Sequence, residues 1–88
     1  MTAKDLAKYV AVFEFEGVDV VATTMMKGDA LWVSAPGQGE YELVPSSLNT
    51  FTVKGVPGYT LKFETDGEKA VGLTAIQPNG TYKAHVKK

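Results

Sequence analysis

One predicted hairpin in the C-terminal half constrains the fold more than any other part of the chain. Apolar and polar residues alternate from Tyr59 to Thr65 and again from Lys69 to Gln77, with Asp66 and Gly67 between the two segments. Alternation with a period of two is typical of a β-strand that buries one face, and an Asp-Gly pair favours a reversal of the chain. The sequence therefore predicts an antiparallel hairpin with one apolar face.

The rest of the chain repeats this pattern of short alternating segments and turn residues. A short helix is predicted from Thr2 to Lys8, with Thr2 as its N-cap. Further strands are predicted at Tyr9 to Glu16, Val18 to Met26, Ala30 to Ala35, Tyr41 to Pro45, Thr50 to Val53 and Thr81 to Lys87. Together with the hairpin these segments give about eight strands.

The fold class that follows is all-β. About eight short strands joined by tight turns favour an antiparallel meander that curls into a small barrel or half-barrel, because a flat sheet would leave two edges unpaired. Residues 1–88 are predicted to form a single domain. Since many of the predicted inward residues are aromatic, we expect side chains to fill most of the interior. The predicted inner face consists of Tyr9, Ala11, Phe13, Phe15, Leu31, Val33, Tyr41, Leu43, Phe51, Val53, Leu61, Phe63, Val71, Leu73, Tyr82, Ala84 and Val86.

Composition excludes several classes of function. Nine basic and ten acidic residues are scattered along the chain and give a net charge of −1, so nucleic acid is not an expected partner. No apolar run approaches the roughly 18 residues of a membrane span, and the first residues lack the apolar core of a signal peptide. The absence of cysteine removes disulfides and thiol chemistry. We expect either a cytosolic protein or an excised domain.

Few residues suggest catalysis or metal binding. His85 is the single histidine and has no nucleophile or second strong ligand near it in the sequence, so we expect a solvated strand residue. Glu14, Glu16 and Asp19 cluster around the first predicted hairpin but lack the spacing of a calcium loop. The sequence predicts no catalytic residue, metal site or cofactor.

The predicted outer face carries more apolar residues than a solvated sheet needs. Two explanations are open. The N-terminal helix and the loops cover these residues, or they form a surface that docks on another domain or a second copy of the chain. The candidate interface residues are Val10, Val12, Trp32, Val44 and Ile76.

A second candidate site lies at the end of the second predicted strand. Met25 and Met26 could line a barrel mouth together with Trp32, because adaptable side chains suit an apolar ligand that is loosely specified. The alternative is that the same residues only fill the core.

Several packing and turn residues of the chain, taken in order, form a recognisable series. They are Leu6, Tyr9, Ala11 and Phe13, then Gly28, Asp29 and Leu31, then Leu43, Pro45 and Phe51, then Phe63, Asp66, Gly67, Val71, Gly72, Leu73 and Gln77. This series resembles the small lipocalin-like C-terminal domain of serine beta-lactamase-related hydrolases, the penicillin-binding-protein-like esterases and peptidases. The resemblance covers nearly the whole chain, with Ala11 where the family favours Gly and Phe13 where it favours Tyr.

The resemblance implies a noncatalytic accessory domain that packs against or gates a hydrolase catalytic domain. In the family the catalytic Ser-x-x-Lys lies in the preceding domain, and this chain contains no such motif. The resemblance also implies a periplasmic or extracellular location, as parent hydrolases are commonly exported. The alternative function is the binding of a small apolar ligand in the barrel mouth.

Overall fold

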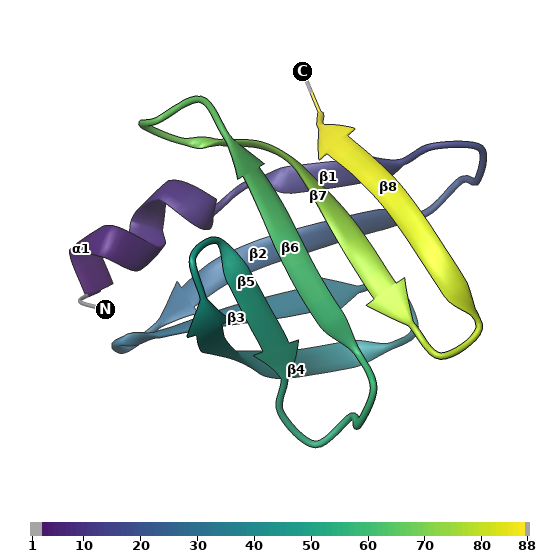
Figure 1. Cartoon of the computed structure of the whole chain (residues 1–88), viewed down its shortest axis with the longest axis horizontal. Helices are drawn as coiled ribbons and strands as arrows, with labels where there is room; N and C mark the ends of the chain where they lie inside the picture. The colour runs from purple at the N-terminus through teal and green to yellow at the C-terminus, as the bar shows by residue number, and fades with distance from the viewer. Residues whose placement is uncertain (1–2, 88) are drawn as a thin grey trace.

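The computed structural model describes residues 3–87. A short helix and a 3₁₀ turn precede eight strands that form one closed barrel (Figure 1). The predicted all-β barrel of eight antiparallel strands with a short N-terminal helix is therefore confirmed. The elements are α1 (Ala3–Leu6), η1 (Ala7–Tyr9), β1 (Val12–Phe15), β2 (Val21–Lys27), β3 (Ala30–Ala35), β4 (Gly39–Ser47), β5 (Thr50–Val53), β6 (Thr60–Thr65), β7 (Ala70–Gln77) and β8 (Gly80–Val86).

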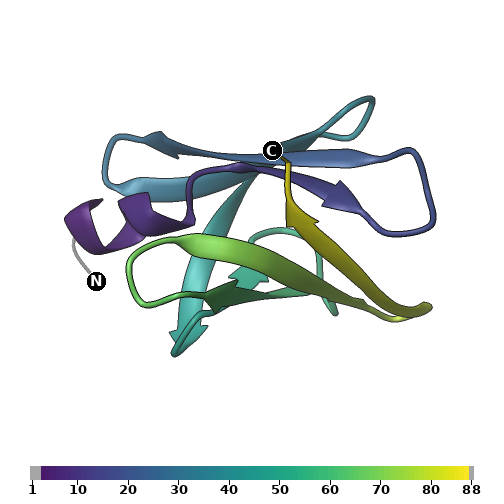
Figure 2. The same ribbon diagram turned by 90° about the horizontal axis from the view of Figure 1, so that it is seen from above.

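The barrel is a simple meander in which each strand pairs antiparallel with the next one along the chain. It closes where β8 returns to β1, with Phe13 opposite Val86 and Phe15 opposite Ala84. Viewed from above, β1 and β8 are seen to meet although they lie at opposite ends of the sequence (Figure 2). Closure pairs the edges that a flat sheet of these strands would leave exposed.

Most strand boundaries lie close to the predicted ones, and β3 and β5 coincide with them. The largest difference is at the first strand, which begins at Val12 because residues 7–9 form η1. The second strand begins at Val21, after a turn, and β4 extends beyond its predicted limits on both sides. The predicted N-cap, Thr2, lies outside the described residues.

The turn of the C-terminal hairpin is held by its aspartate. The Oδ1 atom of Asp66 accepts hydrogen bonds from the backbone N–H groups of Glu68 and Lys69, each at 3.0 Å. These bonds favour the charged carboxylate, so the pKa of Asp66 is lowered, chiefly by the bond from Glu68. The Asp-Gly turn signal thus marks a four-residue loop, 66–69, that is closed by a side chain.

Aromatic rings fill the end of the barrel that lies next to α1 and η1. The Tyr9 ring is 4.8 Å from the Phe63 ring and 5.1 Å from the Phe51 ring, measured between centroids. Phe63 also contacts Phe13 at 5.7 Å and Phe51 at 5.5 Å, and both contacts are edge-to-face. Leu6 of α1 belongs to the same buried cluster. The two helical turns therefore close this end, which we call the closed end.

Three hydrogen bonds, one of them fully buried, fasten the helical turns and the residues after them to the barrel. The Tyr9 hydroxyl donates to Oδ1 of Asn49 at 2.5 Å. Thr24, the one buried polar residue among those described, donates from Oγ1 to the Tyr9 carbonyl at 2.5 Å and accepts from the Ala11 N–H at 2.9 Å. The chain between η1 and β1 is thus tied to β2.

Replacing Thr24 with valine should lower the free energy of unfolding by about 1–3 kcal/mol, because the shape is kept while buried backbone groups lose their partner. The measurement is urea denaturation followed by circular dichroism. Thr23→Val, at the neighbouring position that faces outward on β2, is the control and should change stability by less than about 0.5 kcal/mol. Equal effects at both positions would contradict this role of Thr24.

One predicted core residue faces solvent because of a β-bulge. The pairing of β6 and β7 runs from Glu64 opposite Gly72 to Thr65 opposite Ala70, so Val71 is the extra residue on β7. Ala70 is buried in its place, and Val71 is 43% exposed. The prediction that Val71 lies inside was wrong, since simple alternation does not hold across a bulge.

Two tyrosines assigned to the inner face are also exposed, for a different reason. Tyr41 pairs with Val33, and Tyr82 pairs with the buried Ala75, so both tyrosines occupy inward positions. They are nevertheless 37% and 40% exposed. Both lie at the end of the barrel opposite α1, where the interior opens to solvent.

Candidate functional site: an apolar cavity at the open end

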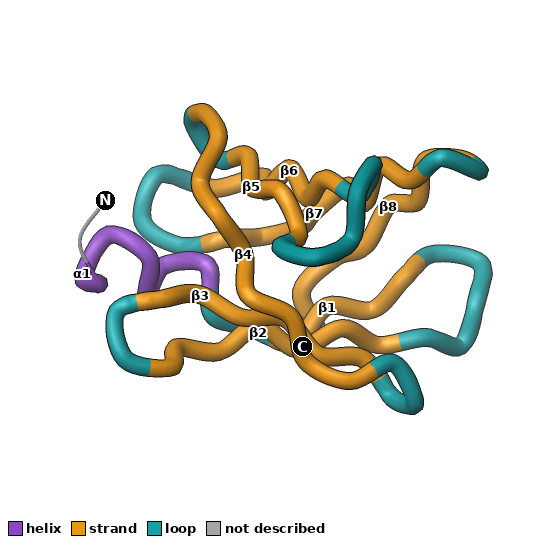
Figure 3. Tube along the Cα trace, turned by 90° about the horizontal axis from the view of Figure 1, so that it is seen from below, coloured by secondary structure: helices purple, strands orange, loops and turns teal. Residues whose placement is uncertain are grey.

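The interior opens at the end opposite α1 and η1, which we call the open end. Figure 3 shows the helical turns at one end and the turns after β1, β3 and β7 at the other. A cavity of about 470 Å³ occupies this half of the barrel. Its lining consists of Phe15, Val20, Ala22, Val33, Ala35, Gln38, Tyr41, Val53, Val56, Tyr59, Leu61, Leu73, Ala75 and Gln77. The expectation of a mostly filled interior is therefore correct only for the closed end.

Small side chains at inward positions explain why the open end is hollow. Ala22 on β2, Ala35 on β3 and Ala75 on β7 line the cavity, whereas the buried cluster near α1 contains larger side chains, among them Leu31 of β3, Phe51 of β5 and Phe63 of β6. Leu61 and Leu73 belong both to the buried core and to the cavity lining. They form the floor that separates the hollow half from the aromatic half.

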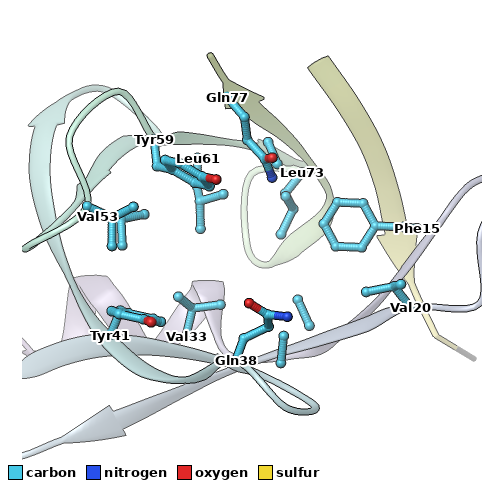
Figure 4. Close-up of a pocket in the computed structure, with 14 residues that line it drawn as sticks. Phe15, Val20, Val33, Gln38, Tyr41, Val53, Tyr59, Leu61, Leu73 and Gln77 are labelled. Atoms are coloured by element: carbon cyan, nitrogen blue, oxygen red, sulfur yellow. The ribbon is translucent and has the colours of Figure 1, made fainter. Parts of the chain in front are cut away.

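Polar groups gather at the rim of the cavity. Gln38 comes from the turn between β3 and β4, and Gln77 is the last residue of β7. Figure 4 shows their side chains extending toward each other from opposite walls. Tyr59 lies beside Leu61 and Tyr41 lies beside Val33 in the same view. The cavity is therefore apolar in its depth and polar at its opening.

None of the described residues that line this cavity carries a charge. The lining consists of apolar side chains, two glutamines and two tyrosines. One of the tyrosines, Tyr41, is 37% exposed and lies at the rim. An adjoining hollow at the rim, of about 270 Å³, is lined by Phe15, Val18, Val20, Gln77 and Tyr82. Apolar walls with a few convergent polar groups are the usual composition of a small-molecule site.

The three predicted ligand residues lie elsewhere. Met25 is paired with Trp32 across β2 and β3, on the outer face of the barrel. Met26 faces inward and packs on the core, paired with Leu31 near α1. The barrel mouth that was expected at this position does not exist, because α1 and η1 close it. The cavity lies at the other end.

The five candidate interface residues do not form one surface. Val10, Val12, Val44 and Ile76 are between 37% and 44% exposed, as predicted for outward positions. Trp32 is on β3 and Ile76 is on β7, which are separated by three strands in either direction around the closed ring. The Nζ atom of Lys27 lies 4.6 Å from the centre of the Trp32 ring and also bonds to Glu40, so this indole is partly covered.

The other titratable candidates lie on the outer wall. His85 is exposed on β8 and is paired with Glu14 of β1. Glu16 and Asp19 are exposed at the turn between β1 and β2. Within residues 3–87 no group of three or more histidine or acidic side chains is placed to hold a metal ion. Over the same residues no helix is long and apolar enough to cross a membrane.

Sequence reasoning missed the cavity, although a signal for it was present. Ala22, Ala35 and Ala75 stand at positions where alternation directs a side chain inward, at strand ends that share one end of the barrel. A cluster of small inward residues at one end indicates unfilled space there.

The fold and the site together define a closed antiparallel barrel with one sealed end and one apolar cavity. No family model, curated protein or solved structure matches this chain. The relation to the domain of beta-lactamase-related hydrolases therefore stays a prediction.

Proposed function

We propose that this barrel binds a small, largely apolar molecule in the cavity at its open end. The observation that carries the proposal is the cavity itself, about 470 Å³ in volume and lined mainly by apolar side chains. Ligand-binding cavities in proteins are typically about 300–1,000 Å³ and are apolar with a few polar groups. A domain with a filled interior would not support this function.

The cavity volume limits the size of the ligand. At about 30 Å³ for each water molecule in the liquid, the cavity volume of about 470 Å³ corresponds to roughly 16 waters. A flexible chain of about ten carbons with one polar end group matches this space. The tail would contact Leu61, Leu73 and Ala75 in the floor and wall, and the polar end would lie at the rim.

Nuclear magnetic resonance with decanol as the ligand tests the proposal. We expect shifts of backbone amide signals in the strands that line the cavity, in particular around Ala22, Ala35 and Ala75. Trp32 lies outside the cavity, so its fluorescence should not change when decanol binds. Shifts confined to Met25, Trp32 and their neighbours, or no shifts at all, would contradict the proposal.

The accessory role that the resemblance implies is compatible with this proposal but has less support from the geometry. A docking module needs a contiguous apolar outer patch, and here the candidate interface residues are divided among β1, the segment before it, β3, β4 and β7. Packing against a hydrolase catalytic domain, self-association and the absence of catalysis stay predictions from the sequence.

A further inference from the structure

We infer that the cavity selects ligands whose polar end is uncharged and able both to donate and to accept hydrogen bonds, as in a fatty alcohol or a primary fatty amide. Carboxylates and alkylammonium ions with the same tail are discriminated against. This inference rests on the proposed function and adds to it the chemical class of the ligand. It is carried by the two glutamines that face each other across the cavity.

The geometry of the rim supports a neutral head group. Gln38 and Gln77 extend toward each other from opposite walls of the cavity (Figure 4). Each glutamine amide has a carbonyl oxygen that accepts and an NH₂ group that donates. A ligand hydroxyl or amide at the rim can both donate to a glutamine carbonyl oxygen and accept from a glutamine NH₂ group. A carboxylate can only accept and an ammonium can only donate, so each uses only one of the two kinds of group that a glutamine amide offers.

The charge distribution points the same way. None of the described lining residues is acidic, basic or a histidine. The four residues of the ion pairs Lys27–Glu40 and Lys54–Glu42 do not line the cavity, and each of them already has a partner of opposite charge. Asp19 adjoins Val20 near the rim but is itself exposed. An ionic head between the rim side chains would lose part of its water without gaining a counterion, which is costly.

The test compares four ligands with the same tail, namely decanol, decanamide, decanoate and decylammonium, at neutral pH and below their aggregation limits. Dissociation constants come from isothermal titration calorimetry. We expect the alcohol and the amide to bind at least about tenfold more tightly than either ion, because neither ion finds a counterion. If one ion binds as tightly as decanol, the inference is wrong while the proposed function stands. If none of the four binds, the proposed function itself fails.

A charge placed at the rim should change the selectivity in a known direction. Gln77→Lys supplies a counterion for a carboxylate, so decanoate should gain at least about tenfold in affinity relative to decanol. Thr74→Lys, on the outward face of the same strand, adds an equal charge outside the cavity and should leave the preference for decanol unchanged. A purely structural role of Gln77 would not produce this reversal. An unchanged preference in a folded Gln77→Lys protein would overturn the inference.

Removal of both rim amides provides a second measurement that does not introduce a charge. In the double variant Gln38→Leu with Gln77→Leu, decanamide should lose about threefold to tenfold in affinity, the usual effect of a lost hydrogen bond. Decanol should also weaken, since it uses the same groups. Unchanged affinity for both ligands would show that the glutamines do not contact the head group.

Discussion

Replacing Phe63 with alanine should lower the free energy of unfolding by about 3–5 kcal/mol, which is the usual cost of removing a buried phenylalanine. Phe63 is 2% exposed and contacts the rings of Tyr9, Phe13 and Phe51. A chain of this length has a total stability of about 4–13 kcal/mol. The substitution therefore removes a large share of the stability, and part of the population should be unfolded in water.

Urea denaturation followed by circular dichroism measures the loss. Val71→Ala, on the same hairpin, is the matched control, because Val71 is outside the barrel and its replacement should cost less than about 0.5 kcal/mol. If Phe63→Ala is too unstable to analyse, Phe63→Leu should still lose about 1–2 kcal/mol through the missing ring contacts. A larger loss at Val71 than at Phe63 would contradict both the bulge and the position of the core.

The barrel itself could be predicted from the sequence, because its strands obey simple alternation over most of their length. Phe51, Leu61 and Phe63 are buried where period-two alternation places them. Turn residues set the strand ends to within a few positions, and the number of strands made closure the natural way to pair both edges. These features depend on local sequence, and local sequence was sufficient for them.

Three features depended on how one segment of the chain packs or pairs with another, and they were not predicted. The bulge at Val71 arises from the pairing of β6 with β7, and no residue of β7 alone indicates it. Tyr9 fits the alternating pattern of the first predicted strand, but it lies in η1. Its ring packs in the core at the closed end, and its hydroxyl donates a hydrogen bond to Asn49. Met26 was placed at a mouth because sequence alone did not show which end α1 covers.

The cavity is the clearest case of this limit. Its existence depends on the summed volume of side chains from seven different strands and their turns, so no single motif marks it. The resemblance to an accessory domain gave no indication of it either. The relevant signal was the cluster of alanines at one end, which gains meaning only after the strands have been placed in register.

Two alanines of β7 allow a direct test of whether one half of the barrel is hollow. Ala70 is 4% exposed and belongs to the core cluster at the closed end, and Ala75 is 3% exposed and lines the cavity at the open end. The two residues are alike in type, strand and burial. Ala70 lies beside the bulge and both residues belong to the buried core, but only Ala75 lines the cavity.

Substitution by leucine should therefore have opposite effects at the two positions. Ala70→Leu overpacks a filled region and should lower the free energy of unfolding by about 1–3 kcal/mol. The leucine of Ala75→Leu extends into the cavity. This substitution should raise the free energy of unfolding by about 0.5–2 kcal/mol, as cavity-filling substitutions commonly do. Urea denaturation of both variants beside the wild type gives the comparison.

The variant that gains stability should lose affinity for the ligand. Ala75→Leu occupies volume that the ligand needs, so decanol should bind at least about tenfold more weakly to this more stable protein. Ala70→Leu, where it remains folded, should bind decanol as the wild type does. Destabilisation of similar size in both variants would mean that the open end is packed as tightly as the closed end. A gain in stability together with a loss of binding is the combination that only an unfilled cavity at the ligand site produces.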